Sequence, residues 1–133
     1  HSAGRSDDVP VTRVLVVDDD NDVRAALRKV LLTAGFEVEE AADGAAALAL
    51  HQANPGDVLI VDIYMPGMDG IEAMVRLLVE YPGVRIIASS GGGFRDQEDM
   101  LKTATRLGAV RTIRKPFTPA EVVTAVREAL GTS

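Results

Sequence analysis

The 133-residue sequence contains no cysteine and no tryptophan, and only 4% of its residues are aromatic. Without cysteine, disulfides, thiol catalysis and cysteine-ligated metal sites are excluded, which favours a reducing compartment and predicts a cytoplasmic protein. Because 47% of the residues are nevertheless hydrophobic, a core built mainly of Val, Leu, Ile and Ala is expected. The length is typical of one domain.

Long apolar runs and an excess of positive charge are also missing. No run approaches the roughly 20 residues that a membrane-spanning helix needs, so no membrane association is expected. The formal net charge of −6 at pH 7 argues against direct binding to nucleic acid or to an anionic membrane surface. Residues 1–10 are interpreted as a tag remnant and a disordered tail, and the folded domain is expected over residues 11–131.

Five short apolar segments alternate with helical patterns along this domain. Strands are predicted at 13–17, 36–40, 58–61, 85–88 and 111–114. Helices are predicted at 22–34, 43–54, 69–81 and 96–107, and a last helix begins at the cap Thr118 and reaches Leu130. This alternation predicts an α/β fold with a doubly wound, five-stranded parallel sheet and helices on both faces.

The helical patterns also assign side chains to the core or to solvent. In the helix over 22–34, the apolar residues recur every three or four positions and predict a buried face. Arg24, Arg28 and Lys29 fall outside that face and are expected in solvent. His51, in the Ala-rich helix over 43–54, is likewise expected at the surface.

Polar residues collect where the predicted strands end. Asp18, Asp19 and Asp20 follow the first strand, and the others are Asp62 after the third, Ser89 and Ser90 after the fourth, and Lys115 after the fifth. Because ligands of open parallel sheets bind at the carboxyl ends of the strands, these side chains are expected to converge. Converging carboxylates repel one another by a few kcal/mol per pair at an effective dielectric constant of ~20. A divalent cation and a lysine can offset this repulsion.

An all-oxygen cluster of this kind suits Mg²⁺ or Mn²⁺. A carboxylate beside such a metal and a lysine can act as a nucleophile toward phosphorus, so the cluster predicts a phosphoryl-acceptor site. Each element alone also has an ordinary interpretation: Asp62 as a turn residue, Lys115 as a surface residue and the acidic triplet as a solvated helix cap. The glycines at 91–93 predict a flexible loop, because no Lys-Ser/Thr pair follows as in a P-loop.

Three motifs together resemble those of response-regulator receiver domains. They are LVVDD at 15–19, VDIYMPGMDG at 61–70 and KPF at 115–117, in the order and at the spacing of that family. The resemblance implies a flavodoxin-like fold with strand order 2-1-3-4-5. It also implies a two-component signalling switch, not a general enzyme, that catalyses only its own phosphorylation and dephosphorylation after receiving phosphate from a histidine kinase.

The resemblance carries one role to each matching residue. The resemblance implies that Asp62 is the phosphoryl acceptor and that Asp19, Asp62 and the backbone carbonyl of Tyr64 ligate Mg²⁺, while Asp18 acts through a metal-bound water. Lys115 pairs with a phosphoryl oxygen, and the Lys115–Pro116 peptide is expected to be cis. Ser90, with Ser89 as the alternative, is the hydroxyl that moves toward the phosphoryl group. Tyr64 is also expected to shield the acyl phosphate from water and so to slow its hydrolysis.

One departure from the family concerns the signal relay. The family often has an aromatic residue three positions before the lysine, where this chain has Thr112. The expected partners are a histidine kinase or phosphotransfer protein, and a downstream protein target or output domain. A homodimer through the helix over 96–107, the strand over 111–114 and the last helix is a further implied possibility.

Two other function classes remain as alternatives. An aspartate-nucleophile phosphatase would carry Asp-x-Asp, whereas this chain has Asp62-Ile-Tyr64 and is too short for a cap domain. Turnover of a phosphomonoester would support that alternative. A phosphorylation-independent interaction module could keep the fold, and a failure to phosphorylate while Mg²⁺ still binds would favour it.

Overall fold

The computed structural model describes residues 11–65, 70–91 and 97–131. Strands and helices alternate along these residues as β1 (Arg13–Val17), α2 (Asn21–Thr33), β2 (Glu37–Ala41), α3 (Gly44–Ala53), β3 (Val58–Asp62), α4 (Gly70–Glu80), β4 (Ile86–Ser90), α5 (Gln97–Leu107), β5 (Arg111–Arg114) and α6 (Pro119–Leu130). The predicted order of elements is therefore confirmed. Among the described residues, no helix combines the length and the apolar character needed to cross a bilayer.

All of the paired strands run parallel in the order β2-β1-β3-β4-β5, which confirms the implied topology. The central strands β1 and β3 pair with Val17 opposite Val61, and β3 pairs with β4 with Asp62 opposite Ser89. Because the strands share one direction, their carboxyl ends lie along one edge of the sheet. That edge carries the polar residues that follow each strand.

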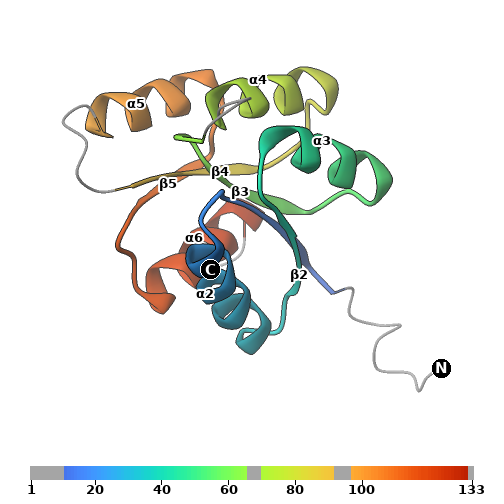
Figure 1. Ribbon diagram of the computed structural model, residues 1–133, viewed down its shortest axis with the longest axis vertical. Helices are drawn as coiled ribbons and strands as arrows, with labels where there is room; N and C mark the ends of the chain where they lie inside the picture. The colour runs from blue at the N-terminus through green and yellow to red at the C-terminus, as the bar shows by residue number, and fades with distance from the viewer. Residues whose placement is uncertain (1–10, 66–69, 92–96, 132–133) are drawn as a thin grey trace.

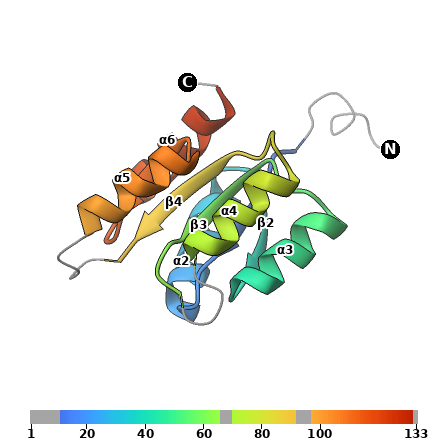
Figure 2. The same ribbon diagram turned by 90° about the horizontal axis from the view of Figure 1, so that it is seen from above.

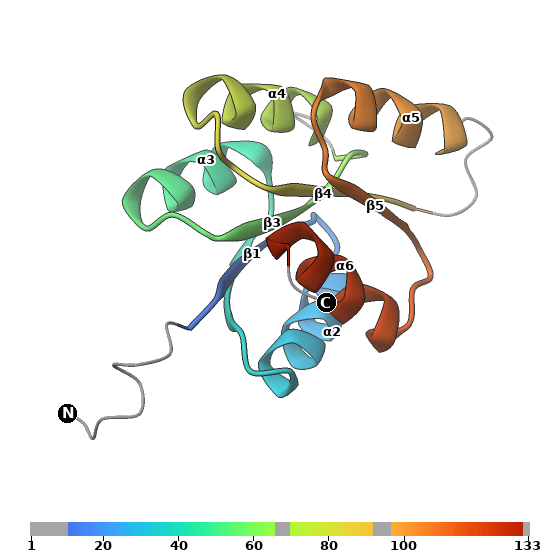
Figure 3. The ribbon, with the colours of Figure 1, turned by 180° about the vertical axis from the view of Figure 1, so that it is seen from behind.

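Helices α3, α4 and α5 cover one face of the sheet, and α2 and α6 cover the other (Figures 1 and 3). Figure 2 shows α3, α4 and α5 side by side over their face of the sheet. Successive residues of a strand point to opposite faces, so β1 sends Leu15 and Val17 toward one helix layer and Val14 and Val16 toward the other. Each fully buried side chain of this kind contributes about 1.5–3 kcal/mol, which is how a core with few aromatic residues is stabilised.

Side-chain caps explain where several helices begin. The Asp20 carboxylate accepts the backbone N–H groups of Asp22 and Val23 at the start of α2, and Asp43 caps α3 in the same way. Thr118 and Glu121 form the predicted capping box of α6. Asp69, the first residue of the helix predicted over 69–81, and most of the predicted glycine loop lie outside the described residues.

The fourth strand is longer than the sequence pattern predicts. Ser89 and Ser90, expected in a loop, are the last two residues of β4. The Ile63 N–H donates to the Ser89 carbonyl at 2.9 Å, and the Lys115 N–H donates to the Ser90 carbonyl at 2.9 Å. Because both neighbouring strands continue the backbone pairing, β4 extends two residues beyond its apolar run.

The prediction that His51 lies at the surface is wrong. Its side chain is buried, and its ring packs edge-on against Tyr81 with the ring centroids 4.6 Å apart. The Nδ1 atom accepts the backbone N–H of Gly56 at 3.1 Å, and burial lowers the pKa of the imidazole. His51 lies four residues after Ala47 on the inner face of α3, a spacing that indicates burial.

Candidate functional site

Three carboxylates meet at the carboxyl edge of the sheet, as predicted. One oxygen of each of Asp18, Asp19 and Asp62 lies within 4.8 Å of the others. Asp18 and Asp19 directly follow β1, and Asp62 ends the neighbouring strand β3, so the pairing of these two strands brings the acids together. Asp18 and Asp62 are buried, whereas Asp19 is exposed, so one side of the cluster is open to solvent.

Lys115 joins the two buried carboxylates. Its Nζ atom lies 2.7 Å from Asp18 Oδ2 and 3.4 Å from Asp62 Oδ2. The lysine directly follows β5, and the peptide between it and Pro116 is cis, as predicted. Burial alone would lower the pKa of this ammonium, but its hydrogen bond to Asp18 and the charges of both carboxylates outweigh burial and raise the pKa.

Asp62 has an unusual acidity. Burial raises the pKa of its carboxyl from 3.8 to about 6, although the Tyr64 backbone N–H and the Lys115 ammonium act in the opposite direction. The Tyr64 N–H donates to Oδ1 at 3.0 Å, which leaves Oδ2 beside the lysine. The neighbouring Asp18 carboxylate adds to the rise in pKa. A cation in this pocket would favour the ionised form, which is the form that acts as a nucleophile.

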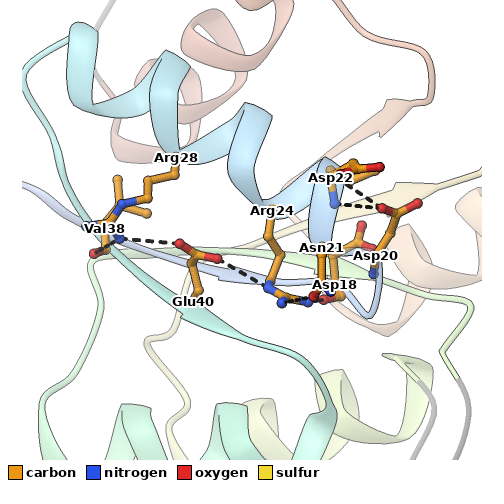
Figure 4. Close-up of polar contacts among 9 residues, drawn as sticks. Asp18, Asp20, Asn21, Asp22, Arg24, Arg28, Val38 and Glu40 are labelled. Atoms are coloured by element: carbon orange, nitrogen blue, oxygen red, sulfur yellow. Dashed lines mark hydrogen bonds and ion pairs between the residues drawn. The ribbon is translucent and has the colours of Figure 1, made fainter.

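The carboxylate of Asp18 is held on both oxygens. Its Oδ1 atom accepts the Asp20 backbone N–H at 2.9 Å, while Oδ2 accepts the Lys115 ammonium. The Asp18 main chain is also anchored, because its N–H donates to the Ala41 carbonyl at 3.1 Å and its carbonyl accepts Arg24 Nη1 at 2.6 Å. Figure 4 shows Arg24 reaching from α2 to this loop. The prediction that Arg24 points to solvent is therefore wrong.

Gly70 explains how α4 reaches the end of β3. A Cβ atom at this position would overlap the Asp62 carbonyl oxygen and crowd the Ile63 backbone. Only glycine allows this close approach of two backbones. The sequence motif contains this glycine, but the contact that requires it is visible only in the folded chain.

The two candidate switch hydroxyls both lie at the end of β4. Ser89 and Ser90 are buried, and Ser89 pairs with Asp62 in the sheet register. The Ser90 hydroxyl donates to the Gly91 carbonyl over a long 3.5 Å. A hydroxyl held this weakly can exchange its partner at small cost. The choice between the two serines stays a prediction.

The position of the missing aromatic residue borders a hollow. Thr112 is exposed on β5, and a hollow of about 320 Å³ between α5 and β5 is lined by Thr112, Leu101, Thr105 and Arg114, among others. Arg114 forms an ion pair with Glu98 across this space. Within the described part of the chain, the side chains that line this hollow are small, aliphatic or charged, and none of them is aromatic.

The donor set fits a hard divalent cation. Three carboxylates within one small pocket, open on the Asp19 side, supply the oxygen ligands that Mg²⁺ and Mn²⁺ prefer and leave room for retained water. Asp18, Asp19 and Asp62 are the residues that could hold the ion. The predicted ligation by the Tyr64 carbonyl stays a prediction.

Comparisons with known proteins agree with this geometry. The family model for the response regulator receiver domain matches residues 14–127. Sporulation initiation phosphotransferase F of Bacillus subtilis is 33% identical over 118 residues, which cover 89% of this chain and 93% of that protein. Transcriptional regulatory protein PrrA of Mycobacterium tuberculosis is 39% identical over 118 residues, which cover 89% of this chain but 49% of that protein.

A similar solved structure is the receiver domain of NtrX from Brucella abortus. It superposes with a TM-score of 0.84 at 30% identity, covering 90% of this chain and 99% of that chain. The likeness extends over the sheet and both helix layers, because nearly the whole of each chain is included.

Proposed function

The chain belongs to the response regulator receiver domain family of two-component signalling, and on that premise we propose that Asp62 accepts a phosphoryl group in a Mg²⁺-dependent reaction. The observation that carries the proposal is the pocket itself. A buried carboxylate with a raised pKa shares it with two further acids and a lysine. Burying such a group of charges is costly, and groups with strongly shifted pKa values cluster at functional sites, so the pocket favours a reactive role.

Asp19, Asp62 and the Tyr64 backbone carbonyl would hold the Mg²⁺ ion, with Asp18 acting through a water molecule. The ion supplies charge neutralisation for the incoming phosphoryl oxygens. The Asp20 N–H and the Lys115 ammonium each contact one oxygen of the Asp18 carboxylate and help to hold its direction.

The transfer needs few protein groups. An Asp62 carboxylate oxygen forms a bond to phosphorus while the bond between phosphorus and the donor nitrogen of a phosphohistidine breaks. Lys115, which has three N–H donors, contacts a phosphoryl oxygen as a point charge. The phosphoryl donor would be a histidine kinase or a phosphotransfer protein. Hydrolysis of the acyl phosphate by water then resets the domain, and Tyr64 slows that step.

The phosphoryl group carries about −1.5 to −2 charges, one of which replaces the charge of the Asp62 carboxylate that it esterifies. The Ser90 hydroxyl then turns from its long bond to the Gly91 carbonyl toward the phosphoryl oxygens, with Ser89 as the alternative. This movement at the end of β4 shifts the equilibrium between two conformations of the face formed by α5, β5 and α6. We assign the downstream target or output domain, and a possible homodimer contact, to that face.

A small phosphodonor tests the proposal directly. With acetyl phosphate and Mg²⁺, the intact mass should rise by one phosphoryl group, and Asp62→Asn or a chelator should abolish the gain. Asp99→Asn, which changes an exposed carboxylate on α5, is the matched control and should label normally. An unlabelled parent that still binds Mg²⁺ would instead support the interaction-module alternative, and turnover of a phosphomonoester would support the phosphatase alternative.

A cytoplasmic location is part of the same proposal. It is supported by the absence of cysteine from the sequence. Histidine kinases and phosphotransfer proteins would meet the domain in that compartment.

A further inference from the structure

Arg24 makes three contacts that converge on the loop after β1. Its Nη1 atom donates to the Asp18 carbonyl at 2.6 Å, its Nε atom lies 3.2 Å from Glu40 Oε1, and its Nη2 atom donates to Asn21 Oδ1 (Figure 4). The arginine side chain is only 14% exposed. Each of its three guanidinium nitrogens thus contacts a group within the protein, and the side chain does not act as a general surface charge.

The carbonyl that Arg24 holds belongs to the peptide unit between Asp18 and Asp19. Rotation of that unit would change the direction in which the Asp19 side chain leaves the backbone. The Asp18 N–H is already fixed by the Ala41 carbonyl of β2. The arginine fixes the other side of Asp18, so the orientation of both carboxylates depends on it.

We propose that Arg24 is a positioning residue for the metal site, which it serves by holding the Asp18–Asp19 peptide in the orientation that directs both carboxylates toward that site. This inference rests on the proposed function, because the ion is the Mg²⁺ of that site. Arg24 contacts neither the ion nor the phosphoryl group. It acts through the backbone, in the way that groups behind a metal site orient the ligands.

The positive charge of Arg24, taken by itself, would weaken Mg²⁺ binding, whereas its positioning of the peptide would strengthen it. A guanidinium close to a cation site repels the cation, so its removal should tighten Mg²⁺ binding if charge were its main contribution. Loss of positioning should weaken binding. The sign of the change in affinity therefore separates the two roles.

Arg28 provides a matched control on the same helix. Its Nη1 atom lies 3.4 Å from Glu40 Oε2 and 3.4 Å from the Val38 carbonyl, so it shares the glutamate with Arg24. Its side chain is 47% exposed, and its hydrogen bonds go to β2 and not to the loop after β1. Arg28→Gln thus removes the same charge from the same network without touching the Asp18 carbonyl.

The test is a calorimetric Mg²⁺ titration of the parent and the variants, each shown by circular dichroism to be folded. Arg24→Gln is expected to weaken Mg²⁺ binding about 10-fold, the usual effect of removing a group behind a metal ligand. Arg24→Lys keeps the charge but not the planar fork, so it should weaken binding too. Arg28→Gln should leave the affinity unchanged. Glu40→Gln should weaken binding in the parent but add nothing in the Arg24→Gln background.

A second measurement needs no metal. Hydrogen exchange of the Asp20 amide, which donates to Asp18 Oδ1, should accelerate in Arg24→Gln and not in Arg28→Gln. Equal or tighter Mg²⁺ binding by Arg24→Gln would overturn the proposal, and so would an equal loss in Arg28→Gln. A parent that binds no Mg²⁺ would refute the proposed function, whereas unchanged Asp20 exchange would refute the role of Arg24 itself.

Discussion

Replacing Asp62 by Asn should stabilise the protein in the absence of metal. Asparagine has nearly the same shape, keeps an oxygen for the Tyr64 N–H and carries no charge. The buried carboxylate has a pKa of about 6 in the folded protein, compared with 3.8 for the unperturbed group. Its ionised form is therefore less favourable in the folded protein than in the unfolded chain, and the substitution removes that cost.

The size of the effect follows from the two pKa values. Each pKa unit corresponds to about 1.4 kcal/mol, so ionised Asp62 lowers the free energy of unfolding by about 3 kcal/mol at pH 7.5. A raised pKa means that the folded state binds the proton more tightly, so this loss develops as the pH rises from about 4 to about 6. At pH 5 the folded protein is largely protonated at Asp62, and about half of the loss is recovered.

Urea unfolding with a chelator present measures this difference. At pH 7.5 the midpoint for Asp62→Asn should lie about 1–3 M above that of the parent, given the usual slopes of 1–3 kcal/mol per molar urea. The difference in unfolding free energy should fall to about half at pH 5, because Asp62 of the folded parent is then largely protonated whereas the asparagine of the variant does not titrate. The control Asp99→Asn changes an exposed carboxylate and should shift stability by less than about 0.5 kcal/mol at both pH values.

Metal provides an independent check on the same reasoning. Mg²⁺ that binds only the folded parent should raise its unfolding free energy, by about 2.7 kcal/mol at 100 times the dissociation constant. Asp62→Asn should gain less, because one carboxylate ligand is lost. The reasoning is refuted if the variant is less stable than the parent, or if their difference is the same at pH 5 and pH 7.5.

Three further substitutions test other parts of the site. Gly70→Ala should lower the unfolding free energy by about 2 kcal/mol or more, because the new methyl group would overlap the backbone of Asp62 and Ile63. Gly83→Ala is the control, since its Cβ atom would meet nothing within 4 Å, and urea unfolding midpoints compare the two variants. Tyr64→Asn should speed loss of the phosphoryl group in a time course after donor removal, and an unchanged rate would contradict shielding. Ser90→Ala should still be phosphorylated, but phosphorylation should no longer change the NMR chemical shifts of the α5 amides, whereas Ser89→Ala should retain that change. The reverse pattern would exchange the roles of the two serines.

The relay proposed between the acidic cluster and the face of α5, β5 and α6 would differ chemically from an aromatic switch. Thr112 is exposed, and the hollow beside it is lined by charged side chains that include the ion pair of Arg114 with Glu98. A change at the acidic cluster would therefore reach α5 by shifting charges and the β4 end. The chain spans about half the length of PrrA.

Features that depend on neighbours in the sequence were predictable. The alternation of strands and helices, the caps Asp43 and Thr118, and the polar residues at strand ends all follow from local patterns, and the structure confirms them. The cluster of Asp18 with Asp62 followed as well, because parallel strands must end at one edge.

Other features depend on distances between segments that no local pattern contains. Arg24 looks like a solvent-facing helix residue until β2 places Glu40, and the loop places the Asp18 carbonyl, within reach of its guanidinium. The spacing of His51 from Ala47 on α3 was a signal for burial, but the ring contact with Tyr81, which directly follows α4, is visible only in the folded chain.

Asp62 shows the division most clearly. The sequence by itself determined which carboxylates would meet, because strand order and chain direction constrain where strands end. Only the tertiary structure decided how strongly they interact. The burial of Asp62, the contact of Lys115 with it and the close backbone approach at Gly70 all depend on how helices and loops pack around that edge. Acidity and orientation are properties of that packing, since both vary with contacts of a few ångströms that a linear pattern does not encode.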